Sequence, residues 1–142
     1  MREILFRGKW LGNGSWVEGA FCPKNCDSIF GQMVYRPSII KLDEPDDGYW
    51  FDIDPDTVGQ YTGLKDKNGK RIFEGDVVKG LFLHERPVAG VVAFHEGAFG
   101  VKWMRGNVDE FNAFTSCCNV KWEVIGNVSD NPELLEGGVN DG

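Results

Sequence analysis

Glycine and proline interrupt this chain so often that little room is left for a helix of ordinary length. One or the other recurs every few residues from Gly8 to Gly106, and β-branched and aromatic residues fill most of the intervals. Glycine and proline destabilise helices, whereas β-branched and aromatic side chains pack well on pleated strands. The sequence therefore predicts a mainly β fold of antiparallel sheets, in which short strands are joined by turns.

Two hairpins are the clearest elements of this pattern. Apolar and polar residues alternate over residues 4–10, and Asn13-Gly14 leads into a return strand at Trp16–Phe21. Asn-Gly favours the positive φ angles of tight hairpin turns. The second predicted hairpin joins 58–64 to 71–78 through a charged turn. Further strands are predicted at 28–34, 38–42, 49–53, 88–95, 99–104 and 120–125.

One or two short helices and, in addition, a single helical turn are predicted. Asp54 can cap a single turn in which Pro55 takes the first helical position. Asn107 precedes Glu110 by a capping-box spacing, and apolar residues follow at three-residue intervals, so a short helix is predicted up to Phe114. A cap followed by proline at the first helical position predicts one or two helical turns from Asn131.

Charge narrows the classes of partner. The 142 residues include 22 acidic and 15 basic side chains, a formal charge of −7, which disfavours binding along duplex nucleic acid. The basic residues gather at one place only, around Asn68-Gly69. We interpret this cluster as a candidate contact for a partner or for single-stranded nucleic acid, with a solvated hairpin tip as the alternative. The cluster comprises Lys65, Lys67, Lys70 and Arg71.

Targeting signals and membrane spans are not expected. No apolar run approaches the ~20 residues that a bilayer span needs, and charged residues interrupt the first seven positions. The sequence therefore predicts a cytoplasmic protein that does not bind membranes.

Five tryptophans and ten phenylalanines are more than a small core requires. Most are expected in the core, and an exposed subset could stack on bases or on a partner's side chains.

Metal and cofactor sites find little support in the residue spacing. Asp52-x-Asp54-x-Asp56 resembles the opening of a calcium loop, but Thr57 replaces the glycine of the sharp turn and Gly63 the final glutamate, so a capped turn is the preferred interpretation. The four cysteines lack paired C-x2-C spacing, which makes structural zinc a minor alternative. They are Cys22, Cys26, Cys117 and Cys118. We expect neither metal nor cofactor.

Catalysis likewise lacks a supporting pattern. His84 and His95 do not stand in a metalloprotease spacing, and the chain contains no Gly-x-Ser-x-Gly elbow and no phosphate loop. If the chain were an enzyme, its catalytic site would consist either of Cys117 as a nucleophile with one of the two histidines, or of a pair of carboxylates. No catalytic residue is predicted.

The segment from Asp54 to Val78 resembles the signature of the YopX family of bacteriophage and prophage proteins. Four flanking segments agree with it, namely Arg2–Lys9, Trp16–Gly19, Glu123–Val128 and Asn131–Leu135. Because the motif glycines suit hairpin turns, the motif is predicted to direct folding. Its residues are Gly59, Gln60, Tyr61, Thr62, Gly63, Leu64, Asp66, Asn68, Gly69, Glu74, Gly75 and Asp76.

The resemblance covers nearly the whole chain and shapes the predicted domain. We predict a single β-rich domain over 1–136, in which 1–53 is an N-terminal sheet portion with a variable insertion at 22–47, and 54–136 is the family core. Residues 137–142 are predicted to be a disordered tail. Glu74–Val78 resembles the start of the first strand of small SH3-like barrels, so a small, partly open barrel is expected.

The resemblance implies a phage or prophage origin and no known activity. The leading hypothesis is a non-enzymatic binding or assembly protein that acts through self-association and a phage or host protein partner. It rests on the missing catalytic pattern, the aromatic surplus and the sheet edges that must be covered or charged. The alternatives are a single-stranded nucleic-acid-binding module that uses the Lys65–Arg71 hairpin, and an enzyme with a carboxylate or cysteine site.

Overall fold

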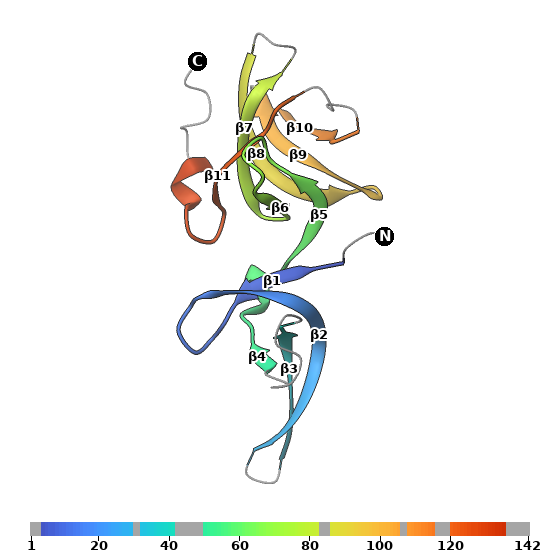
Figure 1. The fold of residues 1–142 in the computed structure, drawn as a ribbon, viewed down its shortest axis with the longest axis vertical. Helices are drawn as coiled ribbons and strands as arrows, with labels where there is room; N and C mark the ends of the chain where they lie inside the picture. The colour runs from blue at the N-terminus through green and yellow to red at the C-terminus, as the bar shows by residue number, and fades with distance from the viewer. Residues whose placement is uncertain are drawn as a thin grey trace. The chain divides into compact units, whose positions relative to one another are not determined.

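The computed structural model describes residues 4–29, 32–41, 50–82, 86–105, 108–115 and 120–135. Within these ranges the chain is mainly strand, arranged in two antiparallel sheets, which confirms the predicted fold class (Figure 1). The chain divides into two compact units, Met1–Tyr61 and Thr62–Gly142, and the boundary falls within strand β5.

The first unit is an antiparallel sheet with the strand order β4-β3-β2-β1-β5. β1 and β2 form the predicted first hairpin, and Phe6 of β1 is in register with both Gly19 of β2 and Gln60 of β5. The core cluster of this unit is Val17, Ile39 and Ile53. Its elements are β1 (Phe6–Lys9), β2 (Trp16–Ile29), β3 (Gln32–Ile40), β4 (Trp50–Asp52), the 3₁₀ turn η1 (Pro55–Thr57) and the start of β5 (Gly59–Lys65).

β2 is longer than the sequence analysis predicted. The predicted strand ended near Phe21, whereas β2 continues to Ile29 and pairs with β3 along this length. A register shift between Cys22 and Asn25 interrupts the ladder, and Pro23 lies within the shifted stretch. Because proline cannot donate to a ladder, a bulge lets the strand pass it without ending.

The second unit is built on a five-stranded sheet with the order β10-β9-β8-β7-β11 (Figure 1). The end of β5 pairs with β6, which confirms the second predicted hairpin. Ile72 of β6 joins Val78, Val92 and Val101 in the core of this unit. Its elements are β6 (Arg71–Phe73), β7 (Asp76–Phe82), β8 (Arg86–His95), β9 (Ala98–Arg105), β10 (Val108–Ala113), β11 (Glu123–Asn127) and the 3₁₀ turn η2 (Pro132–Leu135).

The helix predicted between Asn107 and Phe114 is wrong. Residues 108–113 form β10, which pairs antiparallel with β9, with Phe111 opposite Lys102 and Ala113 opposite Gly100. A capping-box spacing is a local signal, and pairing with a neighbouring strand overrides such preferences. The three-residue apolar spacing therefore did not reflect a helical face.

The two other predicted helical turns are confirmed. Asp54 caps η1, where its Oδ1 accepts the N–H of Asp56 at 3.1 Å. Asp52 accepts the hydroxyl of Ser38 at 3.2 Å, so two of the three aspartates of the calcium-like pattern have structural roles. η2 begins at Pro132 as expected. The described strands form no closed barrel, and the SH3-like barrel stays a prediction.

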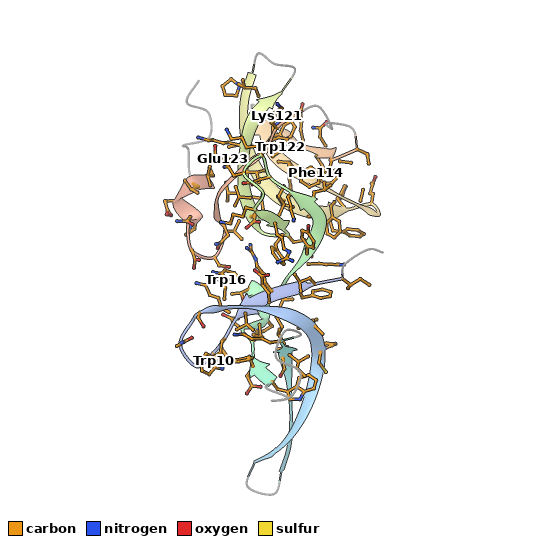
Figure 2. The ribbon with its side chains drawn as sticks, in the orientation of Figure 1. Trp10, Trp16, Phe114, Lys121, Trp122 and Glu123 are labelled. Atoms are coloured by element: carbon orange, nitrogen blue, oxygen red, sulfur yellow. The ribbon has the colours of Figure 1, made fainter. Side chains whose placement is uncertain are left out.

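Most aromatic side chains that the structure describes pack internally, as expected. Trp103 and Trp122 are buried in the second unit, with their ring centroids 6.3 Å apart. Phe114 meets Trp122 edge to face (Figure 2). In the first unit Trp10 meets Phe51 edge to face at 5.3 Å. Trp50 is one of the exposed large side chains.

Several predictions fall on residues outside the described ranges. They concern His84, Cys117, Cys118 and the tail 137–142. Cys22 is a half-buried free thiol. In the part of the chain that the structure describes, no helix is long and apolar enough to cross a membrane.

Candidate functional site

The basic turn, defined as residues Lys65–Arg71, is shaped by the carboxylate of Asp66. One oxygen, Oδ1, accepts the N–H groups of Asn68 at 2.9 Å and Lys70 at 2.8 Å. The other, Oδ2, accepts the N–H of Val124 at 3.0 Å. Asp66 is only 8% exposed. An aspartate that accepts backbone N–H groups ahead of it fixes a turn, so the side chain determines the path of this loop.

These contacts lower the pKa of Asp66. Burial raises the pKa of the carboxyl, but the backbone N–H groups of Val124, Lys70 and Asn68 and the charge of Lys70 lower it, and the net direction is downward. Hydrogen bonds to the charged form stabilise that form. Asp66 is therefore ionised at neutral pH and holds the turn as a carboxylate.

The same contacts attach the basic turn to the edge of the five-stranded sheet. β11 is an edge strand, and Lys67 donates its N–H to the carbonyl oxygen of Trp122 at 2.9 Å, just before that strand begins. Together with the bond from Val124 to Asp66, this contact covers part of the open edge. An edge strand that is covered in this way resists unwanted pairing with other chains.

Lysines from three segments gather around this attachment. Lys67 Nζ lies 3.4 Å and Lys79 Nζ 3.8 Å from the same oxygen of Glu123, which is in register with Lys79 across β7 and β11. Lys121 is also exposed, two residues before Glu123 (Figure 2). Exposed ion pairs contribute little stability, so these lysines remain available to another anion. We call Lys65, Lys67, Lys70, Lys79 and Lys121 the basic surface.

Sequence analysis found only part of this surface. Lys65, Lys67 and Lys70 are exposed as expected of a hairpin tip, and Arg71 is half-buried. Lys79 and Lys121 carried no local signal. The pairing of β7 with β11 places Lys79 opposite Glu123, and the hydrogen bond from Lys67 to Trp122 brings the segment before β11 to the turn. Pairing between strands so far apart in the chain is not encoded in residue spacing.

Other residues of the family motif hold the backbone in place. Thr62 Oγ1 donates to the carbonyl oxygen of Ile72 at 2.8 Å and accepts the N–H of Leu64 at 3.2 Å. Asp76 is 1% exposed, and its Oδ2 accepts the N–H of Phe73 at 2.8 Å. Gly59 and Tyr61 are buried, Gln60, Glu74 and Gly75 are half-buried, and Gly63, Leu64, Asn68 and Gly69 are exposed.

These contacts bear on the enzyme alternative. Asp66 and Asp76, the buried carboxylates of the motif, already accept backbone N–H groups. The lowered pKa of Asp66 makes that carboxylate a weak base. No three His, Cys, Asp or Glu side chains gather in a possible metal site within the described ranges. The structure therefore directs attention to the basic surface.

The comparisons with known proteins agree with the sequence resemblance. No curated protein matches the chain. The crystal structure of protein EF1440 from Enterococcus faecalis has a similar fold, with 22% sequence identity and a TM-score of 0.52 over 95% of this chain and 99% of that one. The family model described as YopX protein matches residues 6–136. Because this match spans most of the sequence, the chain belongs to the YopX family.

Proposed function

We propose that this chain is a non-enzymatic binding protein whose basic surface contacts the phosphates of a single-stranded nucleic acid. The observation that supports the proposal is the attachment of the basic turn by Asp66, which fixes the backbone from which Lys65, Lys67 and Lys70 extend. A binding element that is already ordered loses less conformational entropy when it meets its ligand.

The size of the basic surface favours a single strand over a duplex. The lysines occupy one turn, the adjoining part of β7 and the segment that leads into β11, while the chain as a whole carries a formal charge of −7. Such a surface suits a few consecutive phosphates, which lysine binds as a point charge. The acidic remainder repels a duplex that would run beyond the patch.

A charge-matched pair of variants tests this proposal. Lys65→Gln with Lys70→Gln is expected to weaken binding of an oligothymidylate at least about fivefold at low salt and to lower the salt slope by about 1.4, since each lost single-strand phosphate contact removes about 0.7. Fluorescence anisotropy over a salt series measures both quantities.

The control variant removes two positive charges from the first unit instead. Lys9→Gln with Lys41→Gln changes the net charge equally but leaves the basic surface intact. We expect this control to bind the oligothymidylate like the wild type. If both double variants weaken binding alike, or if the wild type does not bind at low salt, the basic surface is not the contact.

The second edge of the five-stranded sheet favours self-association as a second candidate function. β10 lies at the edge opposite β11, and no further strand pairs with it among the described residues. The basic turn covers part of the β11 edge. The edge strand of a sheet can pair with a strand of another chain. We therefore propose that β10 of one copy pairs antiparallel with β10 of a second copy.

A proline placed on the outer side of β10 tests self-association. Phe114 donates its N–H to the carbonyl oxygen of Phe99 in β9 at 3.0 Å. Since every second residue of β10 bonds to β9, the N–H of Glu110 also faces β9, whereas the N–H of Asp109 faces outward. Asp109→Pro removes no ladder bond and is expected to convert a dimer into a folded monomer in light scattering. Glu110→Pro, by contrast, should destabilise the sheet. A wild type that stays monomeric at high concentration contradicts this proposal.

A further inference from the structure

The two faces of the five-stranded sheet carry different side chains. Residues directly opposite each other in an antiparallel pair share a face. Val92 is opposite Val101, and both belong to the core. Lys102 lies on the other face, where it is opposite both Val91 and Phe111. Lys79, opposite Ala89 and Glu123, shares this face, which we call the lysine face.

On the lysine face the ring of Phe111 meets the ring of His95. The ring centroids are 5.0 Å apart and the planes are inclined at 60°. Phe111 belongs to β10 and His95 to β8, and β9 runs between them. Gly100 of β9 leaves the space for this contact, because a Cβ there would lie 2.7 Å from Phe111 Cζ. The two rings thus form a small aromatic surface across three strands.

This aromatic surface is partly exposed to solvent. The His95 side chain is 59% exposed, and Phe111 is half-buried. Ala93, on the same face of β8 and opposite Gly100, is half-buried and contributes only a methyl group. Gly100 and Ala93 therefore place no bulky side chain beside the two rings.

Cations flank the aromatic surface. Lys102 is exposed and directly opposite Phe111, and Lys79 lies two strands away from Lys102 on the same face. Lys79 meets Lys67 of the basic turn through Glu123, so the lysines continue from the turn onto the face. Carboxylates border this face as well: Glu123 pairs with Lys79, Glu96 Oε1 is 3.7 Å from His95 Nε2, and the register of β10 places Asp109 on the same face as Phe111. From β7 to β10 the face spans three strand spacings, about 14 Å.

We propose that a single-stranded nucleic acid crosses the lysine face and that one of its bases stacks on Phe111 and His95. This inference rests on the proposed function, since the same strand would pass from the basic turn to β10. Aromatic rings beside lysines on an open sheet are the combination that binds single strands, with stacking for bases and cations for phosphates. Lys102 beside Phe111 and Lys79 beside the basic turn would contact the phosphates on either side of the stacked base.

An abasic strand separates base stacking from phosphate binding. The wild type is expected to bind an oligothymidylate of about 12 nucleotides roughly tenfold more tightly than an abasic strand of the same length and charge. Phe111→Leu keeps an apolar side chain but removes the ring. It should abolish this preference and leave abasic binding and the salt slope unchanged. Fluorescence anisotropy measures both affinities.

The matched control is Phe94→Leu. Phe94 is 55% exposed and also meets a second ring, Phe99, at 5.0 Å, but the pair lies on the opposite face of the same sheet. This variant should keep the full preference for the base-containing strand. His95→Ala removes an exposed ring from the lysine face and should lower the preference even if Phe111→Leu folds poorly.

The outcomes distinguish the two proposals. Equal affinity of the wild type for both strands, or a preference that Phe111→Leu and His95→Ala both retain, overturns base stacking while the phosphate contact at the basic turn stands. Absence of binding to either strand at low salt overturns both. A 2-aminopurine base in the strand, whose fluorescence falls on stacking, should be quenched by the wild type and not by Phe111→Leu.

Discussion

Replacing Asp66 by alanine is expected to destabilise the second unit by about 3 kcal/mol. The variant leaves three N–H groups without their carboxylate acceptor, those of Asn68, Lys70 and Val124. A hydrogen bond to a charged group contributes about 1.5–3 kcal/mol, and water can replace part of this at the exposed turn residues. For a unit of this size the loss corresponds to a fall in Tm of at least about 12 °C.

Urea unfolding followed by tryptophan fluorescence measures this loss, because Trp103 and Trp122 are buried in the core of the second unit. Asp66→Asn is the graded control. The amide keeps the size of the side chain and one acceptor oxygen but loses the charge, so we expect about half the effect. An Asp66→Ala variant that unfolds at the wild-type urea concentration would show that the carboxylate does not hold the turn.

The effect of Asp66 should depend on pH in a defined direction. Its pKa in the folded protein is lowered from the usual value of 3.8. The carboxylate therefore stabilises the fold above the unfolded-state pKa, and this contribution is lost as pH falls through the lower folded-state pKa. The difference in unfolding free energy between the wild type and Asp66→Asn should be constant near pH 7 and shrink below about pH 4.

Asp66→Asn also separates geometry from charge in the proposed binding. Removing a negative charge beside lysines would strengthen the binding of an anion if charge alone determined affinity. If the fixed path of the basic turn matters, the variant should bind an oligothymidylate more weakly than the wild type despite its more positive charge. Tighter binding would contradict the role that we assign to the attached turn.

The sequence could predict those features of the fold that depend on neighbouring residues. Gly14 and Gly69, which have positive φ, mark the turns of the two predicted hairpins, and alternation marks strands such as β9. The cap of η1 by Asp54 is equally local. These signals act within a few residues and survive in the folded chain because the neighbouring strands agree with them.

The features that define the candidate site are non-local. Asp66 was recognised as a turn residue, but its bond to Val124 joins positions 58 apart in the chain. Phe111 was assigned to a helix, and its contact with His95 exists only because β8, β9 and β10 are consecutive in the sheet. Residue spacing carries no information on strand order, so neither contact could be predicted.

Replacing Gly100 by alanine is the second large effect that we expect. A Cβ at this position would collide with the carbonyl oxygen of Asn112 and lie 2.7 Å from both Ala113 Cα and Phe111 Cζ. Two of these three neighbours are backbone atoms of β10 and cannot move without separating the strands. Overpacking usually costs about 1–3 kcal/mol, and the rigid backbone places Gly100→Ala at about 3 kcal/mol or above.

Two variants identify the source of this destabilisation in the same urea experiment. A Cβ at Gly97 would have no neighbour within 4 Å, but the residue has a φ of +82°. Gly97→Ala should therefore lower the free energy of unfolding by only about 1–2 kcal/mol, through backbone strain. The double variant Gly100→Ala with Phe111→Ala removes the collision with the ring and keeps the collisions with the backbone. We therefore expect it to remain less stable than the single variant Phe111→Ala. Full restoration would mean that Gly100 serves only to admit the ring of Phe111. In that case the close approach of β9 and β10 would tolerate a side chain, and the glycine would belong to the aromatic surface rather than to the sheet.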